Sequence, residues 1–241
     1  MNLIELIIEK HRQWKDEAAI PADFVWNLRR VGLSREALER AAAQYREELL
    51  SELSFDEPGL RADLAPLSRV ELIDGYLDMF NSFDRADALL YVTEDEPADV
   101  FWNVMIKLWN ECDFIWPLRD MMLSTLRRRR AELSPIALLK AADRDFYNAL
   151  PDRVTIYRGC GRRRIRSLPW TTDREQAAFF AKSLSSGTPS DLVIAEARID
   201  KAEIFFVSTT RDESEVVVDP YRLGRVKVIE RFAPTKFAVV R

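Results

Sequence analysis

The sequence predicts an α+β protein in which a helical N-terminal region precedes a β-rich domain. Apolar residues recur at intervals of three and four along residues 1–150, which is the period of a helix. From Asp152 onward, short runs of β-branched and aromatic residues are separated by turn signals, as is typical of strands. Helices followed by strands indicate the α+β class, with one domain at 1–150 and a second at 151–241.

The first part of the helical region contains four predicted helices. Apolar stripes mark the first helix at residues 3–8 and the second at residues 24–28. A third helix, with a charged outer face, is expected over 37–53. Ser68 and Glu71 have the spacing of a capping box, so a fourth helix begins there.

Three more helices are predicted before residue 150. Residues 100–109 are strongly apolar on one face, which indicates a buried helix. Another helix begins at residues 116–117 and ends in four arginines at residues 127–130, where positive charge suits the helix dipole. The Ser-Pro pair at 134–135 starts the last helix, which extends to about Asn148.

The second region contains six predicted strands and one helix. The strands are expected at residues 154–157, 192–195, 204–207, 216–218, 226–229 and 236–240. The helix begins at Thr172 or Asp173, either of which can serve as its N-cap, and continues through Phe180.

Composition excludes several classes of protein. The hydrophobic content of 47% is enough for a packed core, and two cysteines, Cys112 and Cys160, are too few for a disulfide framework. The single histidine, His11, disfavours catalysis by a histidine base or a multi-histidine metal site. No signal peptide or apolar run of membrane-spanning length is recognised, so we expect a cytoplasmic protein without membrane partners.

Charge is distributed unevenly along the chain. Residues 151–241 carry 17 Lys and Arg against 12 Asp and Glu, a net charge of +5, whereas residues 1–150 carry 19 against 28, a net charge of −9. The basic half favours an anionic ligand such as a dinucleotide or a nucleic acid. The arginines at 162–164 and 166 could bind phosphates, or they could form a solvated basic loop.

Three short motifs occur in order in the strand-rich region: Tyr-Arg-Gly at 157–159, Pro-Trp-Thr-Thr-Asp at 169–173 and Glu-Ser-Glu at 213–215. Side chains alternate along a strand, so Glu213 and Glu215 are expected on one face. This order and spacing resembles the ADP-ribosyltransferase family of the Arg–Ser–Glu class, over about residues 153–220. Residues 1–150 take no part in the resemblance.

The resemblance implies a reaction and a role for each charged residue. The family cleaves the nicotinamide–ribose bond of NAD and transfers ADP-ribose, and it uses NAD as a substrate without a metal. Glu215 would be the carboxylate beside the developing positive charge, and Glu213 would orient or deprotonate the acceptor. Arg158 would hold the phosphate or ribose oxygens of NAD.

The remaining expected site residues are apolar or small. By the same resemblance, Gly159 would allow the backbone to approach the nicotinamide amide. Trp170 would form a wall of the nicotinamide pocket or belong to the core, and one of Phe179 and Phe180 would pack against the nicotinamide while the other belongs to the core. Phe205 and Phe206 are expected in the strand core.

The middle motif departs from the family pattern, which has a serine supporting the catalytic glutamate. Pro169 stands at that place and has no hydroxyl group. Either Thr171 or Ser167 supplies the support, or the support is missing.

We therefore expect an NAD-dependent mono-ADP-ribosyltransferase of the toxin type that modifies a protein or a nucleic acid and releases nicotinamide. The alternatives are an NAD glycohydrolase and a degenerate binding module of the same fold. The sequence leaves open whether residues 1–150 bind an inhibitory or targeting partner or only stabilise the catalytic part.

Overall fold

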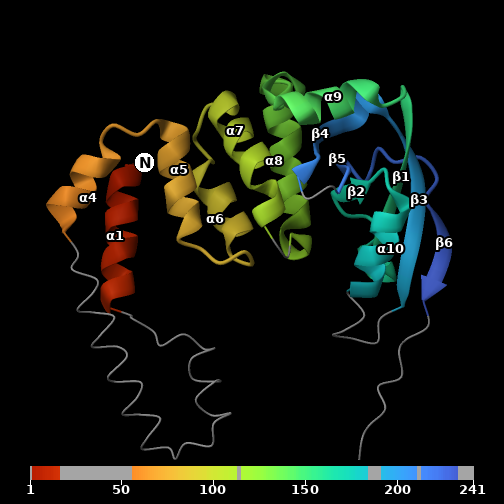
Figure 1. Cartoon of the computed structure of the whole chain (residues 1–241), viewed down its shortest axis with the longest axis horizontal. Helices are drawn as coiled ribbons and strands as arrows, with labels where there is room; N and C mark the ends of the chain where they lie inside the picture. The colour runs from red at the N-terminus through yellow and green to blue at the C-terminus, as the bar shows by residue number, and fades with distance from the viewer. Residues whose placement is uncertain (1, 17–55, 113–114, 184–190, 211–212, 233–241) are drawn as a thin grey trace, which may run out of the picture. The chain divides into compact units, whose positions relative to one another are not determined.

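The computed structural model describes residues 2–16, 56–112, 115–183, 191–210 and 213–232 (Figure 1). The helices expected at residues 24–28 and 37–53 and the strand expected at 236–240 lie outside these ranges. The chain divides into two compact units, Met1–Met79 and Phe80–Arg241.

The first unit contains three helices among its described residues: α1 (Leu3–Asp16), α4 (Glu57–Leu64) and α5 (Arg69–Asp78). The predicted capping box is confirmed at the start of α5, because Glu71 N donates to Ser68 Oγ at 3.3 Å and Ser68 N donates to Glu71 Oε2 at 2.7 Å. It satisfies two backbone donors that the first turn of a helix leaves without a partner.

The second unit begins with four helices joined by short 3₁₀ turns. The helices are α6 (Arg85–Val92), α7 (Ala98–Leu108), α8 (Arg119–Glu132) and α9 (Ala141–Ala149). The 3₁₀ turns are η1 (Trp109–Glu111), η2 (Trp116–Leu118) and η3 (Pro135–Leu138). The helices expected at 100–109 and from 116–117 to 130 are therefore confirmed, the second with a 3₁₀ turn at its start. The helix expected from 134–135 to about 148 is interrupted, because Leu139 and Lys140 are extended between η3 and α9.

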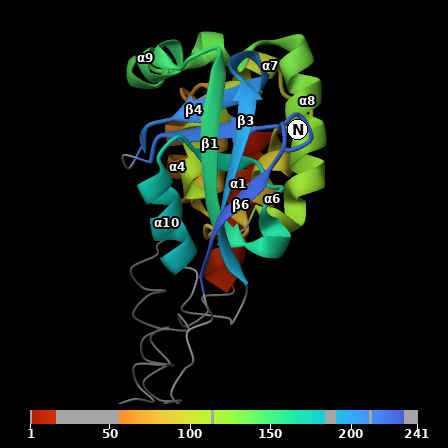
Figure 2. The ribbon, with the colours of Figure 1, turned by 90° about the vertical axis from the view of Figure 1, so that its right-hand side faces the viewer.

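A six-stranded antiparallel sheet follows, with the strand order β4-β5-β2-β1-β3-β6. The strands are β1 (Arg153–Gly161), β2 (Pro169–Thr171), β3 (Leu192–Asp200), β4 (Ile204–Ser208), β5 (Glu215–Val218) and β6 (Lys227–Phe232). Figure 2 shows β1, β3 and β6 side by side. Helix α10 (Arg174–Ser183) packs against β1, β2 and β3, whereas α9 packs against β4. The mixed helix and sheet content is compatible with the predicted α+β class.

The sequence did not predict β2 as a strand. It has only three residues and begins with Pro169, so it is too short to show an alternating pattern. Pairing with β5 on one side and β1 on the other defines it as a strand. A local pattern cannot reveal such a strand, because its partners come from distant parts of the chain.

The domain boundary expected near residue 150 falls inside the second unit. Helices before that residue belong with the sheet because they pack directly on it. The rings of Trp102 and Trp109 both meet Phe206 of β4 edge to face, with centroids 6.1 Å and 5.4 Å away. Phe205 and Phe206 are both buried, which confirms that they belong to the core.

The arginines at the end of α8 hold the helix to its surroundings. Arg127 forms a two-pronged ion pair with the buried Asp219, with donor–acceptor distances of 2.7 Å and 2.9 Å. Arg129 is itself buried and donates to the carbonyl oxygens of Thr93 and Glu94. Arg127 and Arg129 therefore make structural contacts, and they also lie near the end of the helix, as expected.

Gly159 is the seventh of the nine residues of β1 and faces backbone atoms of α10. A Cβ atom at this position would lie 1.7 Å from the carbonyl oxygen of Ala177 and 2.7 Å from the amide nitrogen of Ala181. Both are backbone atoms of α10, which cannot rotate away as a side chain can. The packing of α10 therefore requires glycine at this position.

We expect Gly159→Ala to lower the free energy of unfolding by about 1–3 kcal/mol, because α10 must move away from β1 to accommodate a methyl group. Urea denaturation measures this change. Gly75→Ala is the matched control, since a Cβ there meets nothing within 4 Å and alanine is the better helix former. A Gly159→Ala protein as stable as the Gly75→Ala protein would contradict the packing argument.

Candidate active site

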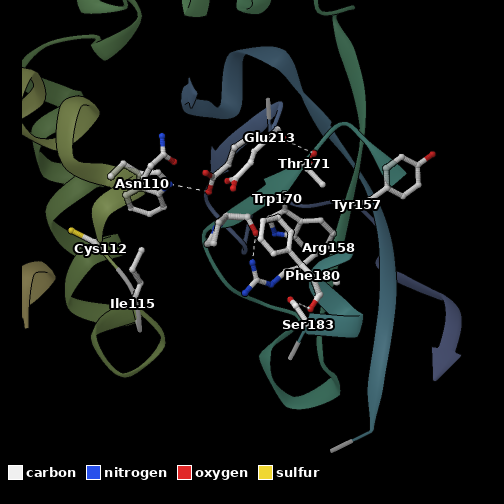
Figure 3. Close-up of a pocket in the computed structure, with 14 residues that line it drawn as sticks. Asn110, Cys112, Ile115, Tyr157, Arg158, Trp170, Thr171, Phe180, Ser183 and Glu213 are labelled. Carbon is white, nitrogen blue, oxygen red and sulfur yellow. Dashed lines mark hydrogen bonds between the residues drawn. The ribbon is translucent and has the colours of Figure 1, made fainter. Parts of the chain in front are cut away.

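A pocket of about 290 Å³ opens in the second unit, between the sheet, α10 and the segment that follows α7 (Figure 3). All seven residues that the sequence singled out line it: Arg158, Gly159, Trp170, Thr171, Phe180, Glu213 and Glu215. The three motifs, which span almost sixty residues of sequence, therefore meet at one place.

Strand register explains why the motifs meet. Thr171 of β2 lies opposite Tyr157 of β1 on one side and opposite Glu215 of β5 on the other. Glu215 in turn lies opposite Ser208 at the end of β4. One row across four neighbouring strands thus contains a residue of each of the three motifs and the last residue of β4.

Both glutamates line the pocket, but the expected alternation of side chains along a strand is not the reason. Strand β5 begins only at Glu215, and Ser214 has a φ of 44°, so the two residues do not simply alternate along a strand. This left-handed conformation is uncommon for residues other than glycine. The bend at Ser214 nevertheless leaves both carboxylates on the pocket wall.

The Thr171 hydroxyl group holds this bend. Thr171 Oγ1 lies 2.8 Å from the carbonyl oxygen of Glu213 and 3.3 Å from that of Ser214, and it accepts a hydrogen bond from Asp173 N at 3.0 Å. The amide of Thr172 adds a hydrogen bond to the Ser214 carbonyl at 3.1 Å. Thr171 therefore supports the backbone that carries the glutamates.

Ser167, the other candidate for the supporting hydroxyl group, and Pro169 have different roles. Ser167 is buried and does not line the pocket, and its carbonyl oxygen accepts a hydrogen bond from Trp170 Nε1 at 3.0 Å. Pro169 lines the pocket and accepts a hydrogen bond from Arg158 through its carbonyl oxygen. Of the two alternatives left open by the sequence, Thr171 is the residue in contact with the glutamate segment.

Arg158 is held in place by backbone oxygens. Its guanidinium group donates to the carbonyl of Pro169 and, through Nε, to the carbonyl of Arg164 at 3.2 Å. Burial lowers the pKa of Arg158 from its ordinary value, and the negative charge of Glu215 acts in the opposite direction. The structure thus places a fixed guanidinium group and a carboxylate in the same pocket.

The helical part of the second unit also contributes to the site. Trp109 Nε1 donates a hydrogen bond to Glu215 Oε1 at 2.9 Å, and Asn110 Nδ2 donates to Ser208 Oγ at 2.6 Å. Cys112 and Ile115 extend the same wall, which lies opposite Arg158 and Phe180 in Figure 3. Residues before 151, which take no part in the resemblance, therefore contribute side chains to the pocket.

Sequence reasoning missed Trp109 because it continues the apolar stripe of α7. A tryptophan in such a stripe indicates core packing, and the side chain is indeed only 3% exposed. Its ring packs against Phe206 while its N–H group points to the carboxylate. No local signal distinguishes a tryptophan that also donates to a distant glutamate.

The positions of Trp170, Phe179 and Phe180 match the expectations only in part. Trp170 is 2% exposed, so it belongs to the core, and it also lines this pocket. Phe180 lines the pocket and is half-buried, whereas Phe179 is 60% exposed. The expectation that one of these phenylalanines belongs to the core is wrong, because the small residues Ala177 and Ala181 form the buried face of α10.

Electrostatics distinguish Glu215 from an ordinary surface carboxylate. Removal of the carboxylate from water, together with the nearby charge of Glu213, raises its pKa to about 7. The hydrogen bond from Trp109 and the charge of Arg158 act in the opposite direction. A group that titrates near neutrality in a pocket is a candidate for a functional role.

The described residues contain neither a candidate metal site nor a candidate membrane-spanning helix. Within those ranges, no three His, Cys, Asp or Glu side chains are grouped so that they could hold a metal ion. Over the same part of the chain, none of the helices has both the length and the apolar character needed to cross a membrane.

Comparison with known proteins adds no family assignment. No protein-family model matches the chain, and no curated protein or solved structure matches it with significant similarity.

We expect Glu215→Gln to raise the free energy of unfolding at pH 8 by up to about 3 kcal/mol. The folded protein holds the Glu215 proton up to a pH of about 7, whereas the ordinary value is 4.5, so folding stability falls as pH rises between these values. The amide in Glu215→Gln does not ionise, so the variant avoids this loss of folding stability. Denaturation at pH 4 and pH 8 measures the difference, which should vanish at pH 4.

The Trp109→Phe variant provides the control for this prediction, because it keeps an aromatic ring and removes the N–H donor. The gain from Glu215→Gln at pH 8 should be larger in the Trp109→Phe background, where the carboxylate has lost its donor. Equal gains in the two backgrounds would show that the hydrogen bond does not stabilise the ionised carboxylate.

Proposed function

We propose that this protein is an NAD-dependent mono-ADP-ribosyltransferase that transfers ADP-ribose to a macromolecule and releases nicotinamide. The observation that carries the proposal is the meeting of Arg158, Glu213 and Glu215 in one aromatic-walled pocket. These are the residue types that the Arg–Ser–Glu class uses, and they come from two segments that are more than fifty residues apart in the chain.

The chemistry accounts for the position of Glu215. Cleavage of the nicotinamide–ribose bond develops positive charge on the sugar, as in other glycosyl transfers. An ionised carboxylate beside that charge is favoured more in the transition state than in the ground state. Trp109 binds only Oε1 of Glu215, so the hydrogen bond can orient the carboxylate while Oε2 interacts with the ribose.

Binding of NAD is divided between the charged and aromatic residues. The guanidinium group of Arg158 suits phosphate or ribose oxygens, because its planar fork donates two hydrogen bonds at once. Trp170 and Phe180 offer apolar walls for the nicotinamide ring. The volume of about 290 Å³ suits one end of the dinucleotide better than the whole molecule, so the adenylate end would extend toward the pocket rim.

Glu213 would act on the acceptor. Its backbone carbonyl is held by Thr171, and its carboxylate lines the pocket with that of Glu215. An attacking group would form a bond to the ribose carbon as nicotinamide leaves with the electron pair of the broken bond. The proton of the attacking group would pass to Glu213.

NAD glycohydrolysis is the alternative that one observation favours. Trp109 and Asn110 form a wall on the glutamate side of the pocket. In the proposed reaction this wall would limit the approach of a macromolecule to Glu213, which would favour water as the acceptor. The binding-module alternative rested on Pro169, and the Trp109 donor weakens it, because Glu215 has a supporting hydrogen bond after all.

The proposal is tested by incubating the protein with NAD that carries a label on its adenylate part, with and without cell lysate. We expect nicotinamide release and transfer of label to a macromolecule. Glu215→Gln should reduce NAD consumption by at least about 100-fold, which is typical for loss of a preorganised charge. In the active protein the rate should rise with pH through about 7, as Glu215 ionises.

The matched control is Glu175→Gln, which changes an exposed glutamate at the start of α10. It should leave NAD consumption unchanged. Free ADP-ribose as the sole labelled product would establish the glycohydrolase instead. Absence of NAD consumption in the unaltered protein at pH 8, with or without lysate, would leave only the binding module.

A separate experiment tests the division of roles between the glutamates. We expect Glu213→Gln to reduce transfer to the macromolecule at least about tenfold more than it reduces NAD hydrolysis, because only transfer needs the acceptor to lose a proton to Glu213. The ratio of bound to free labelled ADP-ribose measures this effect. Equal loss of the two activities would contradict the division.

A further inference from the structure

Five arginines from two parts of the second unit gather beside the pocket. Arg162, Arg163, Arg164 and Arg166 lie in the connection between β1 and β2, and all four side chains are exposed. Arg119, at the start of α8, reaches them by donating from NH1 to the carbonyl oxygen of Arg166 at 3.1 Å. We call these five residues the basic rim.

The basic rim borders the pocket directly. The carbonyl oxygen of Arg164 accepts the hydrogen bond from Nε of Arg158, the arginine that lines the pocket. On the other side, Arg119 lies over the ring of Trp116 with its guanidinium carbon 4.9 Å from the ring centroid. Trp116 directly follows Ile115, which lines the pocket opposite Arg158 (Figure 3). The basic rim is thus in contact with a residue of one pocket wall, and also with Trp116, which is next in sequence to a residue of the opposite wall.

Two of the five arginines of the basic rim form ion pairs with exposed aspartates. Asp191 lies 3.4 Å from Arg162, and Asp120 lies 2.7 Å from Arg119. Both aspartates are more than half exposed, so these pairs contribute little to stability and phosphate groups can replace them. Within the described ranges, Arg163 and Arg166 have no carboxylate within ion-pair distance, and Arg166 donates to the carbonyl oxygen of Pro220 at 2.9 Å. The basic rim therefore keeps a positive surface on a protein whose net charge is −4.

The chemistry of the rim favours a single-stranded nucleic acid. Arginine forks match phosphate oxygens, and a cluster of them along one segment can follow a backbone of repeated charges. Phe179, whose ring centroid lies 5.9 Å from that of the pocket-lining Phe180, offers an exposed aromatic face, and single-stranded binding proteins combine such faces with a basic track. In a duplex the bases are stacked inside and would not reach such faces or the Glu213 carboxylate in the pocket.

From these observations we infer that the basic rim binds a single-stranded nucleic acid and that this strand is the acceptor of ADP-ribose. The identification as acceptor rests on the proposed function, whereas the binding does not. A nitrogen or oxygen of the bound strand forms the bond to the ribose carbon. Nicotinamide leaves with the electron pair of its broken bond, and the proton of the attacking atom passes to Glu213.

The binding is tested with the full chain and a fluorescently labelled oligonucleotide of about 20 nucleotides, without NAD. One phosphate contact by each of the four arginines between β1 and β2 predicts that affinity falls about 50-fold between 50 and 200 mM salt. For Arg162→Ala/Arg163→Ala, two contacts fewer predict only about a sevenfold fall over the same range. Its affinity at 50 mM salt should be at least about tenfold weaker than that of the unaltered protein.

Two control variants separate loss of charge from loss of structure. Arg162→Lys/Arg163→Lys retains the charge and should keep most of the affinity. Arg222→Ala/Arg225→Ala removes two exposed arginines outside the basic rim and should leave binding unchanged. No binding by the unaltered protein at 50 mM salt, or equal binding by both alanine variants, would overturn the inference.

A second measurement distinguishes the strand from the phosphates of NAD. The KM for NAD should be the same in Arg162→Ala/Arg163→Ala and in the unaltered protein. A raised KM with unchanged oligonucleotide affinity would assign the basic rim to NAD and overturn the inference. Oligonucleotide binding by Glu215→Gln, which is expected to be normal, separates failure of the rim from failure of the proposed reaction.

The acceptor role is tested by transferring label from NAD in the presence of the oligonucleotide. We expect the label on the oligonucleotide to be removed by nuclease and to resist protease. Label that appears only on protein, while the oligonucleotide is bound, would overturn the acceptor assignment.

Discussion

The hydrogen bond from Trp109 Nε1 to Glu215 Oε1 joins two parts of the second unit at the pocket. Trp109 is fixed by its packing on Phe206, and its neighbour Asn110 holds Ser208, so the segment after α7 is attached to the ends of both β4 and β5. This attachment gives the glutamate a fixed direction and forms one wall of the pocket. The same burial that makes the bond effective also raises the pKa of the carboxylate.

A second constraint is the bend before β5. Ser214 adopts a left-handed conformation that serine rarely occupies, and Thr171 and Thr172 supply the hydrogen bonds that hold it. Strain and burial of like charges both reduce stability at this point of the fold. Functional sites commonly retain such features, because the surrounding structure compensates for their cost.

Most of the candidate site residues could be predicted from the sequence because the residue types themselves limit the chemistry. A glutamate pair before a valine strand and an arginine before a glycine are visible without coordinates. The sequence could not reveal why Gly159 is glycine, since the reason is the approach of α10 backbone atoms from a later segment. It also could not reveal β2, Trp109 or the bend at Ser214, each of which depends on a partner distant in sequence.

The sequence by itself determined the α+β class, most helices and strands of the described residues, and the charged residues of the candidate site. The class and the elements follow from local periodicity and caps, which act over a few neighbouring positions. The charged residues rest on the resemblance of three short motifs to the ADP-ribosyltransferase family. Only the tertiary structure decided that the boundary between units lies at Met79 and that a helical segment completes the pocket. Those features arise from packing and hydrogen bonds between segments about 100 residues apart, as between Trp109 and Glu215, and no local pattern encodes such pairings.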